Sequence, residues 1–228
     1  MLIHTTIYSE THKDLKNLLN KEWLNPLIKN IENGDKFTLE RLKSLWEKES
    51  NVLDKNFRKK LSCPEILESF NDIQKLILKE AKSIKLVIEN STVNSKDRLD
   101  FDSGKNIHAI VIGGNVLARG LTIEGLICSF FIRSSTQYDT LMQMGRWFGY
   151  RKGYEDLPRI WMTYSVEYDF SKFIEKEEHM RRRITTMREQ GRSPIEFPPE
   201  VAISQGRKAT AKGKMSRRIE SSNGMFYE

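Results

Sequence analysis

Residues 107–112 form a nearly continuous apolar run, Ile-His-Ala-Ile-Val-Ile, that ends directly at Gly113 and Gly114. Such runs are typical of strands in a parallel sheet that is covered on both faces, because neither side of the strand meets water. Other runs of similar character predict the remaining strands, at 2–8, 84–89, 126–132 and 159–164. Because helical patterns alternate with these strands, the sequence predicts an α/β fold with a mostly parallel sheet.

Apolar residues that recur at helical spacing predict the helices between the strands. Thr11 or a neighbour is expected to cap the first helix, and Pro26 is expected to kink or end it. A long amphipathic helix is expected from Val166 to the stop signal at Gly191. The predicted helices cover about 11–26, 39–46, 62–77, 136–147 and 166–190.

The domain organisation follows from where these patterns stop. Of the 228 residues, 1–192 suit one domain with a charged, Lys-rich helical insertion, about 34–83, after the first strand. Residues 193–228 are rich in Pro, Ser, Gly and Lys, so we expect a basic, loosely ordered C-terminal extension. Because a core strand at the second residue is unusual, Met1 is interpreted as an internal position of a longer protein.

Composition indicates which kinds of partner and which cellular compartment suit this chain. The 38 Lys and Arg outnumber the 31 Asp and Glu, giving a net charge of +7 that favours anionic partners such as nucleic acid. Cys63 and Cys128 lie far apart, which supports neither a disulfide framework nor a zinc site and fits a reducing cytoplasm. No apolar run approaches the roughly 18 residues of a membrane span. We therefore expect a soluble, cytoplasmic protein.

The block GGNVLARGLT, residues 113–122, directly follows the most apolar strand. Loops at the carboxyl ends of parallel strands form the ligand crevice of open α/β sheets, and small residues let backbone amides approach phosphates closely. Arg119 and Thr122 are therefore candidates to contact nucleic acid or nucleotide. A tight turn that serves only packing explains the glycines equally well.

A second block, QMGRWFGYR at residues 143–151, lies at the end of the predicted helix 136–147. Arginine is always charged and presents a planar fork, so Arg146 and Arg151 are candidates to stabilise a transferred γ-phosphoryl group from a neighbouring lobe. A surface salt bridge is the ordinary alternative for any single arginine. The flanking aromatics would stack on bases if exposed, whereas buried ones mainly contribute apolar area.

The sequence lacks the motifs that nucleotide-binding loops, nucleases and metal sites require. The pair Gly104-Lys105 has neither the upstream glycine nor the hydroxyl of a P-loop, and no acidic magnesium box follows a strand. Glu80 and Lys82 are residue types that nucleases use, but they lie in a helical, Lys-rich segment and are interpreted as a solvated helix face. We predict no metal site, and a structural role for His4, His12, His108 and His179.

The two blocks resemble motifs V and VI of superfamily-two helicases and translocases, in which an Ala-Arg-Gly-Leu loop follows a strand and a later Gln-x-x-Gly-Arg turn carries arginine fingers. More narrowly, LARGLTIEGL and YDTLMQMGRWFGYRKGYEDLPRIW are similar to the Z-one domain, a helicase-associated bacterial family often described as a proposed endonuclease domain. The N-terminal MLIHTT and the region 198–215 also resemble that family. The resemblance implies the C-terminal RecA-like lobe of a helicase-like ATPase.

The resemblance implies a role for each matching position. The residues expected to act on the γ-phosphate are Arg146, Arg151 and Gln143. Those expected at the nucleotide are Gly120, Thr122 and Gly145. Those expected on nucleic acid are Arg119, Asn115, Trp147 and Tyr150. The sequence departs from the helicase pattern at two positions. In that pattern a second arginine comes three positions after the first, whereas here the next arginine after Arg146 is Arg151. In addition, Thr122 stands where many relatives have Asp.

The implied function is that of the second motor lobe of an ATP-dependent nucleic-acid translocase linked to DNA restriction or phage defence. ATP with Mg²⁺ would be bound mainly by an N-terminal P-loop lobe of the same full-length protein, so this chain alone is expected to be inactive. The expected partners are nucleic acid, with DNA favoured, and restriction-system proteins.

Two alternatives stay open. The first is a non-catalytic nucleic-acid-binding module of an endonuclease, which a P-loop upstream of Met1 would argue against. The second is a dinucleotide-binding enzyme, which ranks last because no G-x-G-x-x-G stands between a strand and a helix.

Overall fold

The structure is a computed structural model that divides into two compact units, residues 1–131 with 147–161 and residues 132–146 with 162–228. Most of the predicted C-terminal extension, residues 193–228, lies outside the described part of the chain. The structure describes residues 1–6, 8–61, 63, 68–89, 107–114, 123, 125–132, 140–145 and 153–191, and the backbone of 138–139, 219–221 and 224–226.

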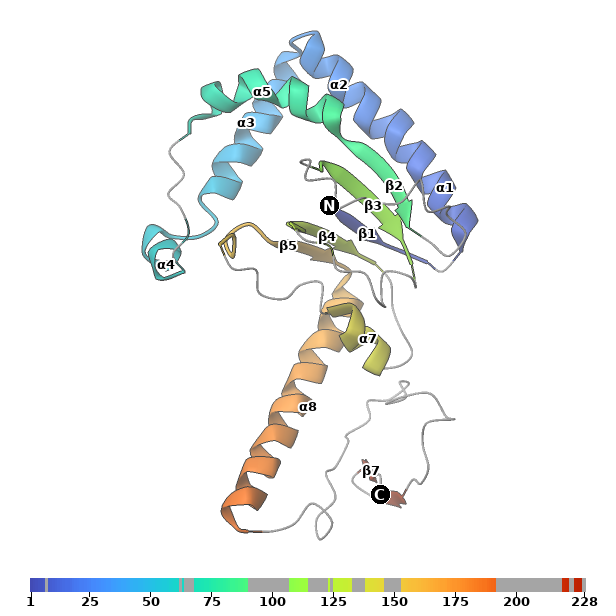
Figure 1. Ribbon diagram of the computed structural model, residues 1–228, viewed down its shortest axis with the longest axis vertical. Helices are drawn as coiled ribbons and strands as arrows, with labels where there is room; N and C mark the ends of the chain where they lie inside the picture. Colours follow the sequence, from blue (N-terminus) through green and yellow to red (C-terminus); the bar gives the residue numbers. More distant parts are fainter. Residues whose placement is uncertain are drawn as a thin grey trace. The chain divides into compact units, whose positions relative to one another are not determined.

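Five parallel strands form the sheet of the first unit. The strands are β1 (Leu2–His4), β2 (Lys85–Glu89), β3 (Ala109–Gly113), β4 (Cys128–Phe131) and β5 (Arg159–Met162). Their order is β2-β3-β1-β4-β5, with β1 at the centre (Figure 1). Leu2 aligns with Val111 of β3 on one side and with Ser129 of β4 on the other. The α/β fold with a parallel sheet is thereby confirmed.

Helices fill the sequence between β1 and β2, which confirms a helical insertion after the first strand. Asp35 caps α3 by accepting a hydrogen bond from the Thr38 backbone N–H at 2.8 Å, and Asp54 caps α4 in the same way. The helices are α1 (Ser9–Leu18), the π-helical turn η1 (Leu19–Leu24), α2 (Asn25–Glu32), α3 (Lys36–Ser50), α4 (Lys55–Lys60) and α5 (Phe70–Ser83).

Three predicted helix features need correction. The expected cap at Thr11 is wrong, because α1 begins at Ser9 and Thr11 lies inside its first turn. The chain stays helical through Pro26, because this proline lies in the first turn of α2, directly after the π-helical turn η1, where a missing backbone N–H is tolerated. The third helix begins at Phe70 rather than near Ser62. A capping box of Ser69 and Asp72 marks its start.

The central strand is buried on both faces. Leu2 and Ile3 are 1% and 5% exposed, and they point to opposite sides of the sheet because side chains alternate along a strand. Leu2 packs with Val111, Ile123 and Leu126. Ile3 packs with Ile110 and Ile112, and this cluster is covered by Leu15, Leu19, Ile84 and Leu86. Helices α1 and η1 therefore cover one face of the sheet.

Truncation of the sheet core should cost much of the protein's stability. Ile112 is fully buried at 0% exposure, so Ile112→Ala is expected to lower the free energy of unfolding by about 2–5 kcal/mol. Leu45→Ala, at a 54% exposed position of the same unit, should change it by no more than about 0.5 kcal/mol. Urea denaturation measures both values, and equal losses would contradict this placement of the core.

The second unit contains α7 (Tyr138–Gly145), the 26-residue helix α8 (Tyr164–Glu189) and a two-stranded ribbon, β6 (Ile219–Ser221) with β7 (Gly224–Phe226). Helix α8 is followed by Gly191 with φ of +66°, which confirms the predicted stop signal. None of the helices in the described residues is long and apolar enough to cross a membrane.

Candidate functional site

The carboxyl end of the sheet is the candidate site, because the first sequence block begins there. Gly113 is the last residue of β3, and it aligns with Glu89 at the end of β2 and with His4 at the end of β1. His4 in turn aligns with Phe131 at the end of β4. Four neighbouring strands therefore end at one level, and the chain segments that follow them leave from the same end of the sheet.

Four polar side chains are buried at this end: His4, Thr5, His12 and Glu89. Their exposed fractions are 1–3%. Burying polar or charged groups costs free energy unless they gain partners, so such a concentration is unusual for a position that serves packing alone. Sequence reasoning missed Thr5 and Glu89 as candidates and assigned both histidines a structural role.

His4 connects β1 to the start of the GGNVLARGLT block. Its Nε2 lies 3.0 Å from the carbonyl oxygen of Gly114, and its ring stacks on Phe131 with centroids 5.0 Å apart and planes 20° apart. The Thr5 backbone N–H donates to the Gly113 carbonyl at 3.0 Å. These contacts hold the first two residues of the block against the central strand.

Near the β1–α1 connection, the buried atoms Thr5 Oγ1 and His12 Nδ1 have no hydrogen-bond partner among the described residues. The other ring nitrogen of His12, Nε2, lies 2.9 Å from the Thr6 carbonyl oxygen and therefore donates to it, which leaves Nδ1 as the acceptor of the neutral imidazole. Buried polar atoms are nearly always paired, so these two atoms can form hydrogen bonds beyond those within the described residues. This end of the sheet thus offers a hydroxyl and an imidazole acceptor to a polar ligand.

In the second unit, α7 carries the start of the QMGRWFGYR block. Leu141 and Met144 are fully buried, whereas Gln143 between them is exposed. Gly145 ends the helix close to α8, and a Cβ built on it would lie 3.0 Å from Cε1 of Phe170. Packing against Phe170 is therefore one reason for a glycine here, beside the nucleotide role that the resemblance implies.

Most of the predicted site residues lie outside the part of the chain that the structure describes. Their convergence on one ligand therefore stays a prediction. The described members are Gln143 and Gly145. The others are Asn115, Arg119, Gly120, Thr122, Arg146, Trp147, Tyr150 and Arg151.

The nuclease-like pair on α5 is engaged elsewhere. Glu80 Oε2 lies 2.8 Å from His108 Nδ1, and the Lys82 ammonium lies 2.7 Å from Glu32 Oε1. All four side chains are substantially exposed, as expected for a solvated helix face. Within the described ranges, no three His, Cys, Asp or Glu side chains are grouped so that they could hold a metal ion.

Comparison with known proteins gives one family. The model of the Z1 domain family, the Z-one domain named above, matches residues 1–207. No curated protein and no solved structure matches the chain. The matched range includes both sequence blocks and the whole parallel sheet.

Proposed function

Because the chain belongs to the Z1 domain family, we propose that it is the second motor lobe of an ATP-dependent nucleic-acid translocase. The observation that carries the proposal is the carboxyl end of the parallel sheet. There the strand β3 runs into the GGNVLARGLT block beside the buried polar side chains of His4, Thr5 and Glu89. Ligands of open α/β sheets bind at this end.

Each block has its own part in the proposed mechanism. Arg119, Asn115 and the basic surface contact the sugar-phosphate backbone, with Trp147 and Tyr150 stacking on bases. Gly120, Thr122 and Gly145 face the nucleotide. Arg146, Arg151 and Gln143 act on the γ-phosphate, where positive charge offsets the negative charge of the transferred group. Hydrolysis then opens and closes the cleft between two lobes.

The nucleotide itself is bound mainly by a different lobe in this proposal. This sequence contains no P-loop, so an N-terminal lobe of the full-length protein supplies the phosphate-binding loop and the magnesium ligands. Nucleic acid, with DNA favoured, is the track, meaning the polymer along which the proposed motor moves. The family resemblance adds a role in DNA restriction or phage defence, together with restriction-system proteins.

The proposal is tested by comparing this chain with a protein that also contains the segment upstream of it. We expect ATP turnover by the chain alone to stay at the buffer background, and the longer protein to hydrolyse ATP faster when DNA or RNA is added. A longer protein without a P-loop and without ATP turnover would overturn the motor proposal. If such a protein still bound nucleic acid, the non-catalytic binding module would be the better description.

A further inference from the structure

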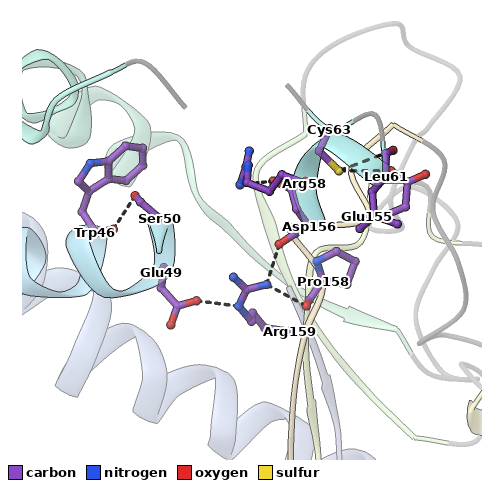
Figure 2. Close-up of polar contacts among 10 residues, drawn as sticks. All are labelled: Trp46, Glu49, Ser50, Arg58, Leu61, Cys63, Glu155, Asp156, Pro158 and Arg159. Carbon is purple, nitrogen blue, oxygen red and sulfur yellow. Dashed lines mark hydrogen bonds and ion pairs between the residues drawn. The ribbon is translucent and has the colours of Figure 1, made fainter. Parts of the chain in front are cut away.

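A buried ion pair joins the helical insertion to the segment that precedes β5. Arg58 of α4 places Nη1 2.7 Å from Oδ2 of Asp156 (Figure 2). The two side chains are 12% and 4% exposed, so this pair is far more buried than the other ion pairs among the described residues. A buried charge that loses its partner is strongly destabilising, which makes such a contact an effective anchor.

A second, partly buried pair lies beside the first. Arg159, the first residue of β5, donates from Nε to Glu49 Oε2 at 2.7 Å, and Glu49 belongs to the last turn of α3. The Nη1 group of Arg159 also donates to the carbonyl oxygens of Asp156 and Pro158, at 2.8 and 3.1 Å. Glu49, Arg58, Asp156 and Arg159 together are called the ion-pair cluster below.

The segment held by this cluster is also tied to the first sequence block. The Gly125 backbone N–H, just after residues 113–122, donates to the Tyr154 hydroxyl at 3.2 Å. Within the segment, the Leu157 N–H donates to the Tyr154 carbonyl at 3.1 Å, and the Gly153 N–H donates to Glu155 Oε2 at 2.9 Å. Residues 153–159 are thus a fixed connector between the insertion and the loop that follows the first block.

The connector begins next to the second block. Gly153 is the second residue after Arg151, and two residues of chain span at most about 7 Å. Arg151 is therefore joined to the connector by a single intervening residue in the sequence.

We propose that the helical insertion positions the arginine-rich block through the ion-pair cluster, and that the insertion thereby controls the catalytic step of the proposed motor. The inference rests on the proposed function. Arg58 and Asp156 are positioning residues in it, because they act on Arg151 through the connector. Glu49 and Arg159 set the same connector against α3.

The structural half of the proposal is tested on the chain as it exists. Arg58→Met removes the charge on a side chain of similar length, and Lys59→Met is the matched control at an exposed position of the same helix. We expect hydrogen exchange of residues 153–159 to become at least about tenfold faster in Arg58→Met, and to accelerate more there than in β3. Lys59→Met should exchange like the wild type. Unchanged exchange in Arg58→Met overturns the proposal, and Asp156→Asn repeats the test if that variant does not fold.

The functional half is tested in the protein that contains both lobes. Arg58→Met is expected to lower kcat for nucleic-acid-stimulated ATP turnover about tenfold while KM for ATP stays constant, because binding and positioning are separate steps. Arg58→Lys should restore most of kcat. Faster exchange with an unchanged kcat overturns the positioning role. A wild-type protein without ATP turnover refutes the proposed motor instead, and the exchange experiment then still decides whether the cluster holds the connector.

Discussion

The variant Arg146→Ala, in a protein that contains both proposed lobes, is expected to lower nucleic-acid-stimulated ATP turnover about a thousandfold. An arginine supplied from a second lobe offsets the charge that develops on the transferred phosphoryl group, and alanine cannot replace it. Arg151→Ala should have an effect of the same order if both arginines reach the phosphate. Steady-state turnover at saturating ATP and nucleic acid measures the loss in kcat.

The comparison of the two variants also identifies which arginine contacts the γ-phosphate. Arg151 comes later in the sequence than the helicase pattern places its second arginine, so the variant with the larger loss in kcat marks the residue that meets the γ-phosphate. Arg188→Ala, at an exposed position in the last turn of α8, is the matched control and should leave turnover unchanged. Full activity in both Arg146→Ala and Arg151→Ala would remove the arginine fingers from the proposal.

The ends of a strand could be predicted where the apolar sequence pattern stops at the same residue as the pairing with the neighbouring strand. Residues 84–89 and 107–112 were predicted within a residue or two of β2 and β3, because β-branched runs there are bounded by polar or glycine residues. The first strand was predicted to Tyr8 but ends at His4. Its partner β3 ends at Gly113, opposite His4, so the β1–β3 ladder of the described residues stops there despite the strand propensity of the threonines that follow.

Because the first strand was predicted too long, part of the candidate site was missed in the sequence. With a strand to Tyr8, Thr5 becomes an interior residue, whereas in the structure it follows the last paired residue at the carboxyl end of the sheet. Glu89 could have been noticed in the sequence, because its carboxylate directly follows the apolar residues 86–88 of the predicted strand. His12 gave none, since its burial depends on how α1 packs.

The helices show the same division between local and long-range information. Ser69 and Asp72 form a capping box that the sequence displays, so the start of α5 could have been predicted from it. The six-residue helix α4 was missed, although Asp54 caps it and basic residues fill its last turn. The pairing of Glu49 with Arg159, 110 residues apart, has no local signature, because tertiary packing alone brings the two side chains together.

Binding of nucleic acid to this chain is expected to weaken steeply as salt rises. Phosphate contacts release counterions, so about six of them would lower the affinity for duplex DNA about a thousandfold between 50 and 200 mM salt. The net charge of +7 is the basis of this expectation. Fluorescence anisotropy of labelled single-stranded and duplex oligonucleotides, over a range of NaCl concentrations, gives the slope of log Kd against log salt.

Arg119→Ala assigns part of that slope to the GGNVLARGLT block. Loss of one phosphate contact should reduce the slope for duplex DNA by about 1 and weaken binding to all sequences alike. Arg41→Ala, at an exposed position in α3 over the Phe37 ring, is the control in the insertion and should leave the slope unchanged. A slope near zero in the wild type would show that the positive charge does not contact the track. An equal change in both variants would place the track away from the carboxyl end of the sheet, because only Arg119 belongs to the block that begins there.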